Sequence, residues 1–69
     1  MRLCSDKEVN RVLLELRARG WRVEYGGHHL KVYTPDGTRR AVVSRTPSDH
    51  RARLNIFSDL RRMGAVINR

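Results

Sequence analysis

The sequence has few or none of several features that mark particular classes of protein. It contains a single cysteine, Cys4, so no disulfide can form within one chain, and a reducing compartment is indicated. No apolar run approaches the roughly 20 residues of a membrane span, and no signal-peptide pattern opens the chain. Cys4 and the three histidines lack the paired spacings of a zinc site. We therefore expect a cytoplasmic protein without a metal, a cofactor or a membrane partner.

Acidic residues are also scarce. Lys and Arg number 15 against 7 Asp and Glu, which gives a net charge of +8 with His neutral. Only Lys7 and Lys31 are lysines, so arginine carries most of the positive charge. The planar guanidinium suits phosphate binding and stacking on bases. This balance predicts a nucleic acid partner. The alternatives are an acidic protein partner or a basic surface that serves solubility alone.

The chain of 69 residues suffices for one compact domain, which we predict over residues 1–69. Ser5 and Glu8 form a capping-box pattern that predicts a helix start, and Gly20 is a typical helix-ending residue. Cys4 is expected to pack as a small buried residue, and Leu14 to pack at the rim of the core. Four apolar residues recur between these ends at helical spacing: Val9, Val12, Leu13 and Leu16.

Three strands and a second helix are predicted next. Alternating residues indicate strands over 21–25, 28–34 and 39–44, with turns at Gly26–Gly27 and at 34–37. Thr46, Pro47 and Asp49 predict the start of the helix as N-cap, first residue and capping carboxylate. Gly64 is expected to end it, with residues 65–69 as a short tail.

The order α-β-β-β-α predicts an α+β fold. Short connections favour a three-stranded antiparallel sheet, and two amphipathic helices need one of its faces to cover. If that face holds Leu30 and Val32, then His29, Lys31 and Tyr33 lie on the open face. An aromatic ring can stack on a base, Lys can pair with phosphate, and His can transfer a proton, so this combination suits RNA.

Further basic residues are candidates for binding RNA phosphates. His50 and Arg51 begin the second predicted helix, where the helix dipole favours anions. Arg53 lies near the apolar side of that helix and is expected to extend to the rim of the sheet. Five more arginines fall on or beside the third strand or late in the last helix: Arg39, Arg40, Arg45, Arg61 and Arg62. Together they have the distribution expected of a phosphate-binding surface.

The glycine–histidine hairpin at 26–30, the Pro35–Gly37 turn, the 46–51 segment and the ending at 60–64 together resemble the HicA-type toxins and their phage-borne or actinobacterial relatives. The resemblance covers nearly the whole chain in element order, although its specific part is short. It implies a double-stranded-RNA-binding-like fold, an endoribonuclease activity on mRNA with one catalytic histidine, and a HicB-type antitoxin as partner.

Two histidines fit the catalytic position that the resemblance implies. Counting from the glycine pair matches His28, whereas counting back from the Pro35–Gly37 turn matches His29. Strand parity favours His29, because it shares a face with Lys31 and Tyr33, although a bulge after Gly27 would reverse this. The alternative function is a non-catalytic RNA-binding or protein-interaction module on the same fold.

Overall fold

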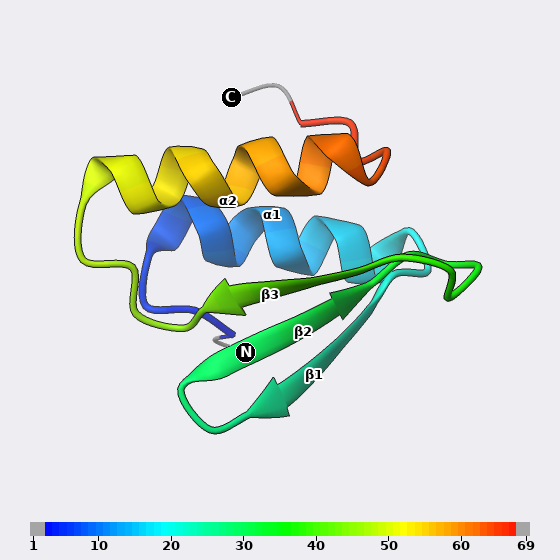
Figure 1. Ribbon diagram of the computed structural model, residues 1–69, viewed down its shortest axis with the longest axis horizontal. Coiled ribbons are helices and arrows are strands. Elements are labelled where there is room, and N and C mark those ends of the chain that lie inside the picture. Colours follow the sequence, from blue (N-terminus) through cyan, green and yellow to red (C-terminus); the bar gives the residue numbers. More distant parts are fainter. Residues whose placement is uncertain (1–2, 68–69) are drawn as a thin grey trace.

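The chain folds into two helices and three strands in the predicted order (Figure 1). The computed structural model describes residues 3–67. The elements are α1 (Lys7–Ala18), β1 (Arg22–Gly26), β2 (His29–Tyr33), β3 (Arg40–Ser44) and α2 (His50–Arg62). Within residues 3–67 no helix is long and apolar enough to cross a membrane.

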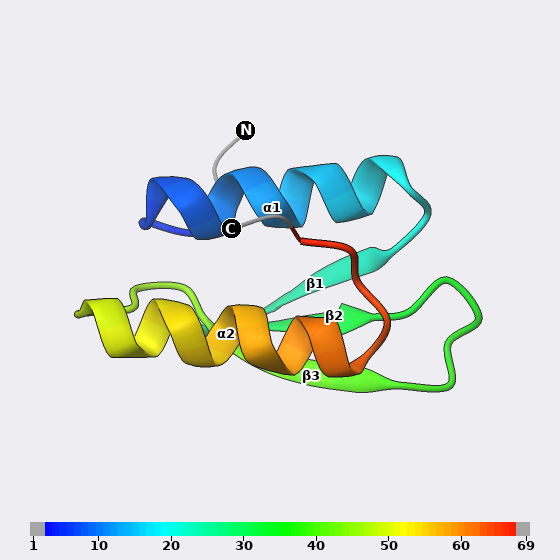
Figure 2. The same ribbon diagram turned by 90° about the horizontal axis from the view of Figure 1, so that it is seen from above.

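The strands form one antiparallel sheet in the order β1-β2-β3, and both helices lie over the same face of it (Figures 1 and 2). The predicted α+β arrangement is therefore confirmed. The opposite face is covered by no helix or strand among the described residues, and we call it the open face.

The core fills the space between the two helices and the covered face. The predicted stripe of α1 is fully buried, as are Leu30 and Val32 on β2 and Val43 on β3. Leu14 is partly buried against this cluster, which agrees with the prediction of rim packing. The three most buried side chains of α2 follow helical spacing, and they are Ile56, Phe57 and Leu60. Burial of these apolar surfaces holds the helices on one side of the sheet.

A two-residue turn connects β1 to β2 and fixes which side chains reach the open face. Gly27 has φ +62°, and no non-glycine residue within 3–67 has a positive φ, so the turn has the form with glycine at its first central position. Gly26 pairs with His29, which places His28 in the turn. The strand predicted from residue 28 thus starts at His29, and β3 starts at Arg40 rather than at residue 39.

The first helix begins one residue later than predicted. Asp6, not Ser5, is the N-cap, and its carboxylate accepts a hydrogen bond of 3.0 Å from the Val9 N–H. The backbone of Ser5 is used elsewhere, because its N–H donates to the Arg45 carbonyl at 2.8 Å. This contact keeps the chain extended alongside the exit from β3, so the helical turn starts only at Lys7.

The second helix begins three residues later than predicted, for a similar reason. The N-cap is Asp49, which accepts from the Ala52 N–H at 2.8 Å, and not Thr46. The Thr46 N–H donates to the Ser44 hydroxyl, and the Arg45 N–H donates to the His28 carbonyl. Residues 44–46 therefore still belong to the exit from the sheet, and the chain must rise to the helical layer before α2 can start.

The segment after α2 packs back onto the molecule. Gly64 has φ +98° and follows the C-cap residue Met63, as the sequence predicts. Ala65 is buried, and the Arg19 guanidinium donates to the Val66 carbonyl at 3.2 Å. The predicted tail is thus held in place as far as residue 67, and residues 68–69 lie outside the described part.

Candidate nucleic-acid interface

The open face presents nine residues in three cross-strand rows. The pairing register places one residue from each strand in every row. We name them the histidine row (Gly26, His29, Ser44), the middle row (Glu24, Lys31, Val42) and the arginine row (Arg22, Tyr33, Arg40). His29, Lys31 and Tyr33 therefore share this face, as parity predicted, and β2 carries them along its centre line.

His29 is exposed at the end of the sheet beside the hairpin turn. Its imidazole makes no hydrogen bond or ion pair within residues 3–67. Ser44 lies opposite it on β3, and Gly26 lies opposite it on β1, where no side chain occupies the space. A Cβ atom at Gly26 would lie 4.0 Å from Lys31 Cε, so the Lys31 side chain leans toward the histidine row. An imidazole, an ammonium group and open space for a substrate thus meet at one place.

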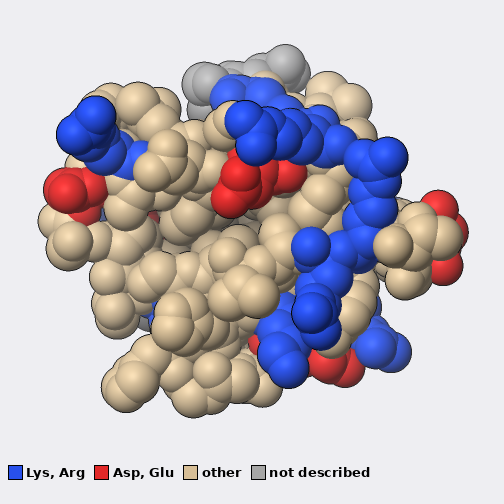
Figure 3. All heavy atoms as spheres, viewed as in Figure 1, with Lys and Arg blue, Asp and Glu red and all other residues tan. Residues whose placement is uncertain are grey.

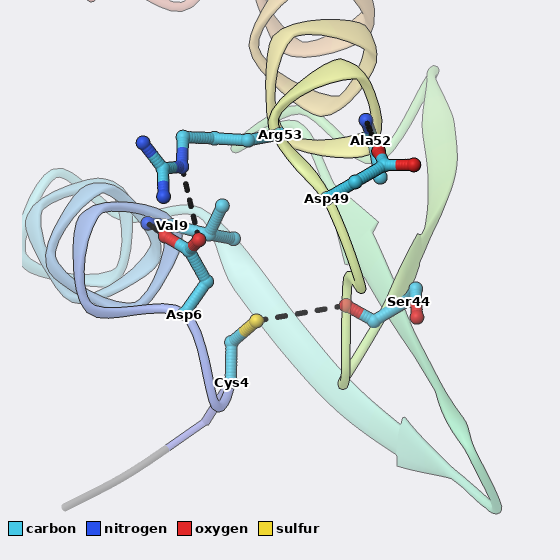
Figure 4. Close-up of polar contacts among 7 residues, drawn as sticks. All are labelled: Cys4, Asp6, Val9, Ser44, Asp49, Ala52 and Arg53. Carbon is cyan, nitrogen blue, oxygen red and sulfur yellow. Dashed lines mark hydrogen bonds and ion pairs between the residues drawn. The ribbon is translucent and has the colours of Figure 1, made fainter.

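His28 lies apart from this group. It lines a pocket of about 300 Å³ together with the segment before α1, whose residues there are Leu3, Cys4 and Ser5. Cys4 is fully buried and its thiol contacts the Ser44 carbonyl at 3.6 Å (Figure 4). Burial raises the pKa of the Cys4 thiol, which keeps it protonated and unreactive. The structure therefore separates the two candidate histidines and leaves Cys4 a packing role.

The arginine row lies at the other end of the sheet. The Arg22 guanidinium carbon is 4.9 Å from the centre of the Tyr33 ring, within the range of a cation–π contact. Glu24 binds the same guanidinium at 3.2 Å. Arg40 is the cross-strand partner of Tyr33 on its other side. Tyr33 thus stands between two arginines on an exposed surface.

Arg39 and Arg45, both predicted to bind phosphate, make contacts within the protein. Arg39 donates to the Arg62 carbonyl at 2.9 Å, at the end of α2. Arg45 lies 5.0 Å from the centre of the Tyr25 ring and donates to the Gly27 carbonyl at 3.3 Å. These contacts direct both guanidinium groups away from the open face, so their binding to RNA phosphate stays a prediction.

Arg53 takes a different course from the one expected. It does not extend to the rim of the sheet, because its Nε donates to the Asp6 carboxylate at 2.9 Å and so joins α2 to the N-cap of α1 (Figure 4). Burial disfavours ionisation of Asp6, but hydrogen bonds from the Val9 N–H and Arg53 outweigh it and hold the Asp6 pKa below its usual value. His50 and Arg51 are exposed in the first turn of α2.

Positive charge is gathered unevenly over the surface. Figure 3 shows a band of Lys and Arg that runs from the C-terminal half of α2 along one side and down toward the sheet. Arg39, Arg40, Arg61 and Arg62 belong to these segments. Within residues 3–67 no group of three or more His, Cys, Asp or Glu side chains is placed to hold a metal ion. The surface thus offers an anion path that leads onto the arginine row.

No family model matches the sequence, and no curated protein or solved structure is significantly similar to it. The geometry of the open face and the resemblance of the hairpin are therefore the two grounds for assigning a function. Arg22 and Gly26 are members of the site that were not predicted from the sequence. The register of β1 with β2 places both on the open face, opposite Tyr33 and His29.

Proposed function

We propose that the protein is a toxin-type endoribonuclease that binds mRNA across the open face and cleaves it beside His29. The observation that carries the proposal is the exposed His29 imidazole next to the Lys31 side chain, with no side chain at Gly26 to block access. Phosphates can approach the face at its other end, the arginine row, from the positively charged band described above. The resemblance to HicA-type toxins supports the same reading.

The chemistry would use the RNA itself as the nucleophile. His29 as general base takes the proton from a ribose 2′-OH, and that oxygen attacks the adjacent phosphorus. The bond from phosphorus to the 5′-oxygen breaks, water donates a proton to that oxygen, and the His29 imidazolium returns its proton to solvent. The products are a 2′,3′-cyclic phosphate and a 5′-hydroxyl end. The Lys31 ammonium is the nearest cation on the face to stabilise the charge that develops on the phosphoryl oxygens.

A protein partner is part of the same proposal. The resemblance implies a HicB-type antitoxin, and the open face is the surface that such a partner would have to cover in order to block His29. No helix or strand of the chain within residues 3–67 covers that face. Co-expression with an antitoxin of this type is therefore expected to protect cells from the protein, and a complex is expected to lose access to RNA.

The decisive experiment is cleavage of a labelled single-stranded RNA with EDTA present. We expect wild type to give fragments with 2′,3′-cyclic phosphate ends, and His29→Ala to lose about 10²- to 10⁴-fold in rate. His28→Ala should stay within about threefold of wild type, because His28 lies off the open face. Intact RNA with wild type, a strict need for a divalent metal, or equal activity in His29→Ala would each overturn the proposal.

A non-catalytic RNA-binding module is the second candidate. It is favoured by one observation, which is that no group within residues 3–67 holds the His29 imidazole in a fixed orientation. A catalytic base is ordinarily oriented by a hydrogen-bonding partner. Binding with a steep salt dependence, together with no cleavage by wild type, would assign the protein to this class.

A further inference from the structure

The arginine row has features of a binding site that the proposed cleavage at His29 does not use. The Arg22 guanidinium stacks over the Tyr33 ring at 4.9 Å, and Glu24 fixes that guanidinium from the side at 3.2 Å. The Arg22 side chain is nevertheless 69% exposed, so solvent and ligands reach the stack. Arg40, the partner of Tyr33 on β3, adds a second cation on the other side of the ring. Such a set offers a flat π-surface between two groups that attract phosphate.

An unpaired nucleobase is the ligand that this chemistry recognises. Bases stack on Tyr rings and on guanidinium planes, whereas bases inside a duplex are already stacked and have no face available. We propose that the arginine row is a stacking subsite for one unpaired base, so that the protein selects single-stranded RNA. This inference rests on the proposed function, because it supplies the substrate class for the site at His29.

The distance between the two ends of β2 sets how far the substrate must extend. Tyr33 follows His29 by four residues on the same strand, which corresponds to about 13 Å. A stacked nucleic acid strand advances about 3.4 Å per nucleotide, so about four nucleotides separate the stacked base from the cleaved bond. An oligonucleotide too short to cover both rows is therefore expected to lose the contribution of the arginine row.

The charges on the open face indicate the route of the RNA backbone. Glu24 places a carboxylate on the β1 side of the middle row, and this charge repels phosphates there. Lys31 on β2 and Arg40 on β3 attract them on the other side. Val42 lies on the open face between Lys31 and Arg40 and is 55% exposed. It offers an apolar surface that a base or a ribose can contact. The backbone is thus expected to follow β2 and β3 from the arginine row toward His29.

Binding should be measured with His29→Ala protein, so that the RNA stays intact. The probe is a fluorescent eight-nucleotide RNA, compared with the same sequence in a blunt duplex and with RNAs that carry one abasic nucleotide. We expect Tyr33→Leu to weaken single-strand binding by about 5- to 150-fold, the range of one lost base stack. Tyr33→Phe keeps the ring and should stay within about twofold. Arg22→Gln should weaken binding several-fold.

Controls separate the subsite from loss of charge and from loss of fold. Arg11→Gln removes one positive charge from exposed α1 surface, outside the open face, and should change the affinity by less than about twofold. The single tryptophan, Trp21, is buried and reports by fluorescence whether each variant is folded. The RNAs with one abasic nucleotide test the same contact without changing the protein. At one position, loss of the base should weaken binding as much as Tyr33→Leu does. Combining that RNA with Tyr33→Leu should cause no further loss.

Three results would overturn the inference. One is tight single-strand binding that is indifferent to Tyr33→Leu and to every abasic position. Another is a duplex that binds as tightly as the single strand. The third is an equal loss from Tyr33→Phe and Tyr33→Leu. If proteins that retain His29 still cleave RNA in these cases, only the stacking subsite is wrong. A wild-type protein that neither binds nor cleaves RNA removes the proposed function as well.

Discussion

The two ends of the open face differ in how firmly their side chains are held. At the arginine row the side chains are held by one another, since Arg22 contacts both Tyr33 and Glu24. The neighbouring loop is also braced, because the Asp36 carboxylate accepts hydrogen bonds from Thr34 and from both the hydroxyl and the N–H of Thr38. At the histidine row the His29 imidazole has no such partner in the part of the chain that the structure describes.

This difference suggests a division of labour along β2. A preorganised stack loses little freedom when a base binds, so it is suited to grip and to position a substrate. An exposed imidazole beside a glycine is suited to approach a reacting group, which then supplies the contacts that orient it. Under the proposed function, substitution at the arginine row should act on binding and substitution at the histidine row on cleavage, and Arg40→Gln and Gly26→Ala test this.

Gly26→Ala should have a larger effect than the other three substitutions below and should act on the histidine row alone. The new methyl group meets only the His29 carbonyl at 3.7 Å and Lys31 Cε at 4.0 Å, which are ordinary contacts. We expect stability to stay the same or rise by about 0.5–1 kcal/mol, because Gly is unfavourable inside a strand. Cleavage should fall about tenfold, because the methyl group fills the space beside the imidazole. Thermal unfolding and RNA cleavage measure the two effects, and a fully active variant would contradict the account of the site.

Arg40→Gln should weaken binding several-fold and flatten its salt dependence. Each phosphate contact on single-stranded nucleic acid contributes about 0.7 to the slope of log K against log salt. We expect the slope to fall by about that amount in Arg40→Gln and to change less in Arg22→Gln, where stacking dominates. Binding titrations at salt concentrations between about 50 and 200 mM measure this slope. An unchanged slope in Arg40→Gln would remove Arg40 from the path of the backbone.

Asp6→Ala should lower the free energy of unfolding by about 1–2 kcal/mol, because it removes an N-cap and leaves Arg53 without its partner. The Asp6 pKa is lowered in the folded state, so its contribution is complete above the pKa of an unfolded Asp and is lost as the pH falls through the folded value. Denaturant unfolding at neutral and acidic pH should show the gap to wild type shrinking in acid. A constant gap would contradict the linkage.

Asp36→Asn should give the smallest change, confined to the loop beside the arginine row. Hydrogen bonds from Thr34 and Thr38 lower the Asp36 pKa to about 2 from its ordinary 3.8. Its stabilising effect is therefore complete above pH 3.8 and is lost as the pH falls toward about 2. An NMR titration of the Asp36 carboxyl in the wild-type protein should give a midpoint near the lower value, and the small stability difference between wild type and Asp36→Asn should disappear toward that pH. A midpoint near 3.8 would mean that the threonine hydrogen bonds are not maintained.

Periodicity and turn chemistry in the sequence were enough to predict the element order, the covered face and the placement of His29. They succeeded because β2 is buried on one face, so a shift of one residue would expose Leu30 and Val32. The helix starts were wrong because Ser5 and Thr46 have good capping side chains, while their backbones are occupied by contacts with residues distant in the chain or at the sheet exit. Local patterns contain no information about such contacts.

Arg53 and Arg22 show the same limit at the level of the site. Arg53 was expected to extend to the rim of the sheet, but its partner Asp6 lies 47 residues away in the sequence. Arg22 looked like a solvated strand residue, and only the register with β2 places it over Tyr33. Charge predicted a polyanion partner, whereas the division of those charges between internal contacts and the open face required the fold.

The contacts of residues 4–6 with the exit from β3 and with α2 also bear on the order of folding. Both hairpins join neighbouring segments, so their formation closes only short loops. Cys4 and Asp6, in contrast, meet partners 40 and 47 residues further on. The sheet can therefore be assembled before α1 is fastened over its covered face, and docking of residues 4–6 would complete the native structure. The sheet and its open face would thus form first, and full stability would come last.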